Sequence, residues 1–223
     1  MKKNIFAIVA HADDEAIGCG GTLLKHQKQG DHISIVYMTN GVSARKNSSD
    51  TDYEQRLRMT KKAGEYLSAK QYFFNFPDNK MDTVAILDVV QAIESVTKRE
   101  LPDIIYTHHY GDLNIDHRIV HQAVMTAFRP IPLVKTPTIY SFEVNSSTEW
   151  NTPINAFAFS PTFFVDISEH IAEKKKLLLI YEDEMRKPPH SRSIDAIEAL
   201  AKVRGNTVGV DYAEAFMLKR KVS

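Results

Sequence analysis

The first 128 residues alternate four times between a short apolar run and a segment of helical character. The first run, residues 5–10, is uninterrupted and rich in β-branched side chains, as expected of a strand buried on both faces of a sheet. The later runs cover residues 32–39, 72–76 and 103–107. Strands that alternate with helices predict an α/β fold, in which a parallel sheet carries helices on both faces.

The loops that follow the four runs are expected to lie together, because the carboxyl ends of parallel strands meet at one edge of a sheet. These loops contain the polar residues best suited to chemistry, and they cover residues 11–15, 39–41, 75–79 and 108–117. We therefore expect one functional site at this edge.

The first helix is expected to follow the glycine-rich segment 18–21 and to run to about Gln29, with Gly30 as its stop. The segment lacks the spacing of a dinucleotide-binding turn, and the acidic residues before it would repel a pyrophosphate. Close packing of helix against strand explains these glycines better, although a nucleotide-dependent enzyme stays an alternative. Further helices are expected over about 52–67, between 83 and 100, and over about 119–128.

The remainder of the chain, residues 129–223, is expected to form a C-terminal cap on the core of residues 1–128. No flexible linker separates the two parts, so we expect a single domain. The cap contains two expected strands, 138–144 and 162–166, and two expected helices, from about 169 to 185 and from 193 to 205. Residues 211–219 are apolar but are not assigned to an element.

Charge and composition exclude several classes of function. Lys plus Arg and Asp plus Glu number 28 each, so the net charge is zero and nucleic acid is not an expected partner. The single cysteine, Cys19, excludes an intramolecular disulfide and a thiolate metal cage. No apolar run is long enough to span a membrane, and the N-terminus has no signal-peptide core. We expect a cytoplasmic protein that can form a homo-oligomer.

A histidine and three acidic residues follow the first apolar run, in the segment His11-Ala12-Asp13-Asp14-Glu15. Burying so many ionisable groups is costly, and imidazole with carboxylate is a ligand set for a divalent metal. His117, with Asp116 beside it, can supply a second imidazole. Together with His11 and Asp14 it leaves one coordination position for water, from which Asp13 could take a proton. Zn²⁺ is the expected ion, and Fe²⁺, Co²⁺ or Mn²⁺ would suit the same ligands.

The segment 11–15 and the later Asn114-Ile115-Asp116-His117 closely resemble the two motifs of the PIG-L/LmbE-like family of zinc-dependent N-deacetylases, A-H-P-D-D-E and H-x-D-H. The resemblance covers most of the chain. Segments 76–79, 107–109, 111–114, 184–186 and 189–193 are similar to a bacterial branch associated with surface-sugar biosynthesis. The resemblance implies a Rossmann-like fold and a hydrolase that removes an N-acetyl group from a small-molecule amino sugar.

The resemblance also implies residue roles. His11, Asp14 and His117 would hold zinc, and Asp13 would be the general base. Asp116 would support the ligands from behind, and Glu15 is expected to orient the motif rather than to bind the metal.

Two positions depart from the family pattern. Ala12 replaces the usual proline, and Asn114 stands where many members have a histidine that assists the oxyanion or protonates the leaving amine. Asn114 can donate a hydrogen bond to an oxyanion but cannot deliver a proton. We expect His190 to deliver it, with His109 as the alternative.

Substrate contacts are expected from Arg56 and Arg192, which could clamp a phosphate as Arg45 could, and from His109 and Asp78. Such contacts would suit a sugar carried on a nucleotide or a lipid. Hydrolysis of another amide, such as an N-formyl or thiol-conjugate amide, stays open. So does a non-catalytic sugar-binding protein, although a binding module needs no base at position 13.

Overall fold

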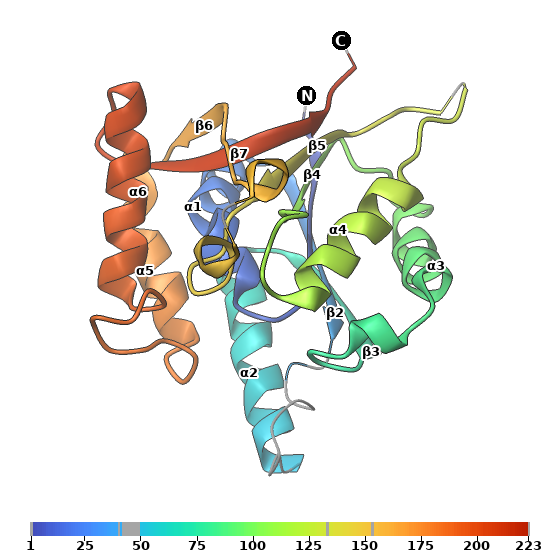
Figure 1. The fold of residues 1–223 in the computed structure, drawn as a ribbon, viewed down its shortest axis with the longest axis horizontal. Helices are drawn as coiled ribbons and strands as arrows, with labels where there is room; N and C mark the ends of the chain where they lie inside the picture. The colour runs from blue at the N-terminus through green and yellow to red at the C-terminus, as the bar shows by residue number, and fades with distance from the viewer. Residues whose placement is uncertain (1, 40, 42–49, 133, 153, 223) are drawn as a thin grey trace.

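A seven-stranded sheet forms the centre of the protein in a computed structural model, which describes residues 2–39, 41, 50–132, 134–152 and 154–222. The strand order is β3-β2-β1-β4-β5-β7-β6 (Figure 1). The first five strands pair in parallel: β1 (Asn4–Val9), β2 (His32–Thr39), β3 (Lys70–Phe76), β4 (Ile104–His108) and β5 (Thr138–Phe142). The last two, β6 (Phe163–Asp166) and β7 (Ala213–Arg220), are antiparallel to each other, and β7 is antiparallel to β5.

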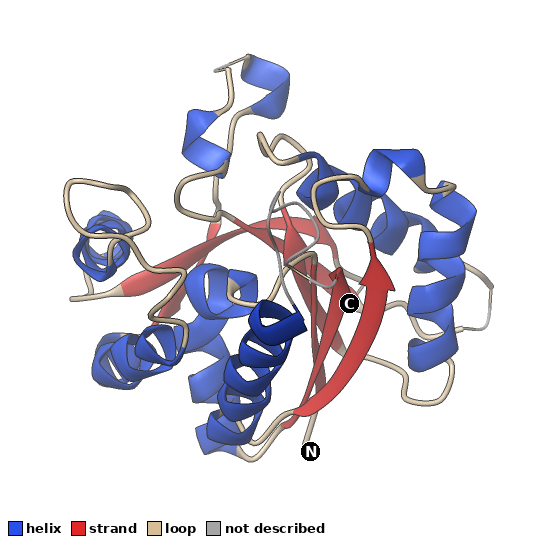
Figure 2. Ribbon diagram, turned by 90° about the horizontal axis from the view of Figure 1, so that it is seen from below, coloured by secondary structure: helices blue, strands red, loops and turns tan. Residues whose placement is uncertain are grey.

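Helices cover both faces of the sheet, which confirms the predicted fold class (Figure 2). The helices are α1 (Asp14–Gln29), α2 (Asp50–Tyr66), α3 (Ile86–Thr97), α4 (Ile115–Ala127), α5 (Ile171–Ile180) and α6 (Ile194–Val208). Alternate residues of β1 enter two cores: Ile5, Ala7 and Val9 pack with α1, α2, α5 and α6, and Phe6, Ile8 and Ala10 pack with α3 and α4. This double burial explains why the first strand reads as an uninterrupted apolar run.

The glycines of α1 lie inside the helix, which begins at Asp14 and not after Gly21. A Cβ on Gly18 would lie 2.2 Å from the ring of Phe142 in β5, and one on Gly21 would lie 2.8 Å from Ile167. These glycines therefore permit close packing of the helix against the sheet, as the sequence favoured, and Gly30 ends the helix in the left-handed conformation, as predicted.

A bend in α1 at Cys19, where φ is −145° and ψ is 18°, releases backbone groups in the protein interior. Lys174 Nζ donates to the carbonyl of Ile17 (2.8 Å), and the Glu214 carboxylate accepts from the backbone N–H groups of residues 21 and 22 (2.8 and 2.7 Å). The two side chains are buried and pair at 2.6 Å. This ion pair thus satisfies the backbone groups that the bend leaves open.

Several element boundaries differ from the expectation. Helix α4 begins at Ile115 because the Asn114 side chain accepts a hydrogen bond from the Asp116 N–H and caps the helix. Helix α3 begins later than predicted, after a 3₁₀ turn at Met81–Thr83. Helix α5 ends at Ile180, and α6 is capped by Ser193 as expected but ends at Gly209, not at Gly205. The unassigned segment 211–219 forms most of β7, so the C-terminal part extends the central sheet.

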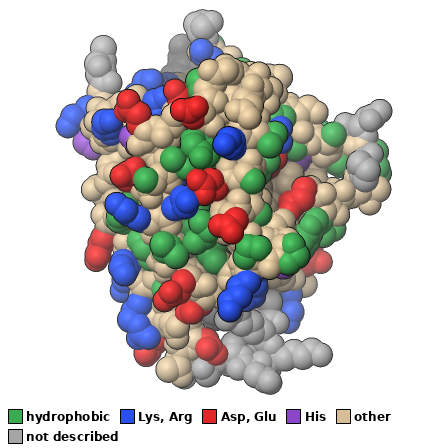
Figure 3. Space-filling model, turned by 90° about the vertical axis from the view of Figure 1, so that its left-hand side faces the viewer, with side chains coloured by type: hydrophobic (Ala, Val, Ile, Leu, Met, Phe, Trp, Pro, Cys, Tyr) green, Lys and Arg blue, Asp and Glu red, His purple; other side chains and the backbone are tan. Residues whose placement is uncertain are grey.

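The surface over α5 and α6 carries Lys and Arg side chains interspersed with Asp and Glu and with hydrophobic groups (Figure 3). The charges on this face are therefore mixed, in keeping with the zero net charge. Among the helices that the structure describes, none combines the length and the apolar character needed to cross a membrane.

Candidate metal centre and active site

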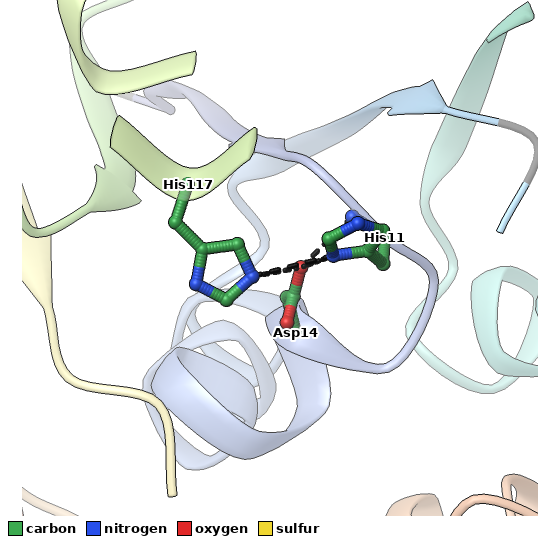
Figure 4. A group of neighbouring side chains, drawn as sticks. All are labelled: His11, Asp14 and His117. Carbon is green, nitrogen blue, oxygen red and sulfur yellow. Dashed lines mark hydrogen bonds and ion pairs between the residues drawn. The ribbon is translucent and has the colours of Figure 1, made fainter. Parts of the chain in front are cut away.

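Three buried side chains, His11, Asp14 and His117, converge at the carboxyl edge of the sheet (Figure 4). His11 follows β1, Asp14 is the first residue of α1, and His117 lies in the first turn of α4. His11 Nδ1 is 3.3 Å from His117 Nε2 and 3.3 Å from Asp14 Oδ2, and His117 Nε2 is 3.4 Å from Asp14 Oδ2. The structure thus brings together the three predicted metal ligands, of which His11 and His117 are 106 residues apart in the chain.

The spacing of these three atoms fits a tetrahedral metal ion. Bonds of about 2.0–2.1 Å to a tetrahedral zinc ion would separate its ligand atoms by roughly 3.4 Å. A divalent cation between the two facing imidazole nitrogens and the carboxylate oxygen could be bound by all three atoms. The residues present therefore fit a divalent metal with an open coordination position.

Acidic groups behind His11 fix the orientation of its ring. His11 Nε2 lies 3.0 Å from Asp116 Oδ2 and 3.1 Å from Asp78 Oδ1, which leaves Nδ1 for the metal. Asp116 also accepts hydrogen bonds from the backbone N–H groups of Asn79 (2.6 Å) and Met81 (3.0 Å). Burial alone would lower the pKa of His11, but Asp116, Asp14 and Asp78 together raise it well above its usual value. Asp116 is thus positioned as a support, as predicted, and Asp78 shares this role.

His117 has a support that the sequence analysis did not identify, Asp112. His117 Nδ1 lies 3.2 Å from Asp112 Oδ1, and the Asp112 carboxylate accepts hydrogen bonds from Ser147, from Thr148 Oγ1 (2.6 Å) and from the Asn114 N–H (2.8 Å). Burial lowers the pKa of His117, but the adjacent carboxylates raise it to about 9. The sequence signals for Asp112 were its place in the loop after β4 and in a segment that resembles a branch of the family.

His108 is a second residue beside the ligands to which the sequence analysis assigned no role. It is fully buried, its ring stacks on that of His117 at a centroid distance of 3.9 Å, and its Nε2 accepts a hydrogen bond from the Ala10 N–H (2.9 Å). Burial lowers the pKa of His108 well below its usual value, so the ring is neutral. It forms an uncharged wall behind the second imidazole ligand.

Asp13, the predicted base, occupies a left-handed backbone conformation with φ of 103° immediately before α1. Its side chain is buried, with Oδ2 3.2 Å from Arg192 Nη1 and Oδ1 3.6 Å from Arg56 Nη2. Burial raises the pKa of Asp13, and the two guanidinium groups oppose that rise. The two arginines therefore hold this carboxylate in place beside the ligand cluster.

Glu15 stabilises the unusual turn at Asp13. It is fully buried, its Oε2 accepts from the Asp13 N–H (3.1 Å), and its Oε1 accepts from the hydroxyls of Tyr37 (3.1 Å) and Tyr181 (2.7 Å). Burial raises the pKa of Glu15 to about 7. None of these three contacts is with a side chain of the ligand cluster, in keeping with an orienting residue.

An open polar pocket of about 230 Å³ lies at the site. Its lining includes His11 and Asp13 together with Asn114, whose Nδ2 donates to Asn79 Oδ1 (3.1 Å). The other lining residues are Gly41, Arg56, Asp78, Asn79, Glu184, Arg186 and Arg192. The predicted substrate residues Arg56, Arg192 and Asp78 are therefore at the pocket, and Arg186 and Glu184 are lining residues that the prediction missed.

The two candidate proton donors lie elsewhere. His190 is exposed, packs edge-on against Trp150, and its Nδ1 accepts a hydrogen bond from the Arg192 N–H (3.0 Å). His109 is buried, with Nε2 2.9 Å from the carbonyl of Phe157, and burial lowers its pKa. Neither lines the pocket. Arg45 lies outside the described residues.

Comparisons with known proteins agree with this geometry. Residues 6–128 match the PIG-L family, described as GlcNAc-PI de-N-acetylase. The uncharacterized deacetylase YaiS of Escherichia coli (strain K12) is 31% identical over 174 residues, which cover 75% of this chain and 84% of that protein. The diacetylchitobiose deacetylase of Thermococcus kodakarensis is 24% identical over 225 residues, covering 95% of this chain and 81% of that protein.

The fold also occurs in a protein with a different activity. The crystal structure of GalB, the 4-carboxy-2-hydroxymuconate hydratase of Pseudomonas putida KT2440, matches with a TM-score of 0.76 and 20% identity, covering 100% of this chain and 98% of that one. Family membership therefore rests on the sequence matches and not on the fold. The chain belongs to the PIG-L family, and the N-deacetylase class that its two motifs predicted is confirmed.

Proposed function

We propose that this protein is a metal-dependent hydrolase that removes the acetyl group from an acetamido sugar. The observation that carries the proposal is the buried cluster of His11 Nδ1, Asp14 Oδ2 and His117 Nε2, at mutual distances of 3.3–3.4 Å, beside the Asp13 carboxylate at one pocket. A base next to such a cluster is what hydrolysis of an amide requires.

Zinc is the ion we propose for the cluster, with Fe²⁺, Co²⁺ or Mn²⁺ as substitutes that suit the same donors. When bound, the ion would supply the Lewis acidity that lowers the pKa of a water and polarises the acetamido carbonyl. Asp78 and Asp116 fix the ring of His11, and Asp112 faces the ring of His117, so both imidazoles would bind with little reorganisation.

The protein's own groups would then handle the proton and the developing charge. Asp13, held by Arg56 and Arg192, would take the proton from the attacking water. Asn114 lines the pocket and its Nδ2 amide can donate to the carbonyl oxygen as negative charge develops there. Protonated Asp13 could return the proton to the leaving amine, and His190 is the competing donor, which would have to enter the pocket.

Sequence relatives support an acetamido sugar as substrate, since one of them is a diacetylchitobiose deacetylase. Two alternatives keep the same site: hydrolysis of another amide, such as an N-formyl group, and sugar binding without catalysis. The position of Asp13 beside the ligand cluster speaks against the second alternative, because binding alone requires no base.

The direct test is acetate release by the zinc-loaded protein from N-acetylglucosamine, its phosphate esters and diacetylchitobiose. We expect turnover of at least one of them and a loss of at least about 100-fold in Asp13→Asn, since general base catalysis contributes about 10²–10⁴-fold. Asp82→Asn, which removes an exposed carboxylate away from the pocket, should leave turnover unchanged. Binding of these sugars without acetate release would overturn the proposal in favour of a binding protein.

A further inference from the structure

Three arginines line the pocket, and two of them are occupied by acidic partners. Arg56 is buried and its Nη1 lies 2.5 Å from Glu184 Oε1, while its Nη2 faces Asp13. Arg192 is bound through Nη1 to Asp13 Oδ2 and through Nε to Ser146 Oγ (2.8 Å). Each of these two arginines therefore pairs with a carboxylate of the protein, and neither is available to neutralise a substrate.

Arg186 is different. It lines the same pocket, it is exposed, and none of the ion pairs formed among the described residues includes it. Its backbone is fixed, because its N–H donates to the Arg192 carbonyl (3.1 Å) and the loop between them is closed by the hydrogen bond from His190 N–H to the Lys187 carbonyl (3.2 Å). The loop thus presents an uncommitted guanidinium group to the pocket.

Each carboxylate that lines the pocket has a partner other than Arg186. Asp13 and Glu184 pair with arginines, and Asp78 lies against His11 Nε2 and accepts from Asn79 Nδ2 (2.9 Å). Arg186 is therefore the pocket arginine for which the described residues supply no ion-pair partner.

We propose that Arg186 binds an anionic substituent on the N-acetyl sugar, a phosphate ester or a carboxylate, and so selects charged over neutral sugars. A guanidinium fork matches the oxygens of either group through paired hydrogen bonds. This inference rests on the proposed function, since it names the substrate class of the same site. It differs from the expectation for Arg56 and Arg192, which become positioning residues of Asp13.

The test compares acetate release from neutral N-acetylglucosamine, its 1- and 6-phosphates and N-acetylmuramic acid, which carries a carboxylate. We expect wild type to prefer one anionic sugar over the neutral one in kcat/KM. Arg186→Gln should lower kcat/KM for that sugar by roughly 10- to 100-fold, the worth of a charged hydrogen bond, and should lower the ratio of anionic to neutral kcat/KM by a similar factor. Lys187→Gln, which removes an exposed charge from the neighbouring position outside the pocket, should keep the preference.

Equal or better turnover of neutral N-acetylglucosamine would overturn this inference and leave the deacetylase proposal intact. A preference that survives in Arg186→Gln would also overturn it. Absence of acetate from every sugar would instead defeat the proposed function. Titration calorimetry with glucosamine 1- and 6-phosphate would then decide the subsite independently, since binding lost only in Arg186→Gln supports it and binding unchanged in that variant refutes it.

Discussion

The hydroxyl of Tyr181 donates a 2.7 Å hydrogen bond to Glu15 Oε1, across 166 residues of chain. Tyr181 follows directly after α5, and Glu15 holds the backbone of the proposed base through the Asp13 N–H. The C-terminal part of the protein is thereby joined to the first motif, so a change remote from the ligands can disturb the base.

Tyr181→Phe removes this hydrogen bond and leaves a fully buried carboxylate with one fewer donor. We expect a loss of about 1–3 kcal/mol in the free energy of unfolding, measured by urea denaturation, and a lower kcat with unchanged metal content. Tyr212→Phe is the control, because its hydroxyl makes only a 3.4 Å contact with Glu198 at a partly exposed position. Equal free energies of unfolding in the two variants would show that the Tyr181 hydrogen bond does not stabilise the protein.

Asp112→Asn removes the negative charge that faces Nδ1 of His117 while keeping the side chain's size. Metal affinity should fall by roughly 10- to 100-fold, as it does when a partner behind a ligating histidine is lost. Competition with a chelator measures the change, and Asp211→Asn, at an exposed site, provides the control. Undiminished affinity in Asp112→Asn would rule out this supporting role.

His190→Ala separates the two candidate proton donors. Because His190 is exposed and does not line the pocket, we expect turnover within about threefold of wild type and an unchanged pH profile, consistent with Asp13 as donor. A fall of 100-fold or more, with loss of the basic limb of the pH profile, would instead assign the proton to His190.

His121 makes stability depend on pH. Burial lowers its pKa to about 4, and its Nδ1 lies 2.8 Å from the His108 carbonyl. The unfolded chain therefore binds a proton more readily than the folded one, and stability falls as the pH drops from about 6.5 towards 4. When the pH is lowered from 7 to 5, protonation of this residue in the unfolded chain should lower the free energy of unfolding by about 2 kcal/mol.

His121→Asn removes that titration, so urea denaturation of wild type and variant at both pH values isolates it. We expect the variant to lose about 2 kcal/mol less than wild type over this interval. Identical losses in the two proteins would contradict a depressed pKa for His121.

The parallel core was predictable because its strands are recognisable in the sequence as apolar runs. The loop after each parallel strand must lie at the carboxyl edge of the sheet. That rule predicts that the loops containing His11, Asp14 and His117 lie together. Strand β7 was not predictable, because its outer half is only partly buried and its pairing with β5 and β6 is antiparallel and remote in sequence.

Two of the residues missed at the site, Asp112 and Glu184, have roles that depend on a partner far along the chain. Asp112 contacts Ser147 and Thr148, and Glu184 contacts Arg56. The arginines Arg56 and Arg192 were placed at the site by resemblance, but only their distances to Glu184 and Asp13 show that their charges are already committed.

The central claim is that His11, Asp14 and His117 hold a catalytic metal, and metal content measured by elemental analysis tests it most directly. The account predicts about one zinc or related divalent ion per chain in wild type and in His32→Ala, an exposed control, and its loss in His117→Ala. Wild type that holds no metal, and gains none when zinc is supplied, would contradict the account at its first step.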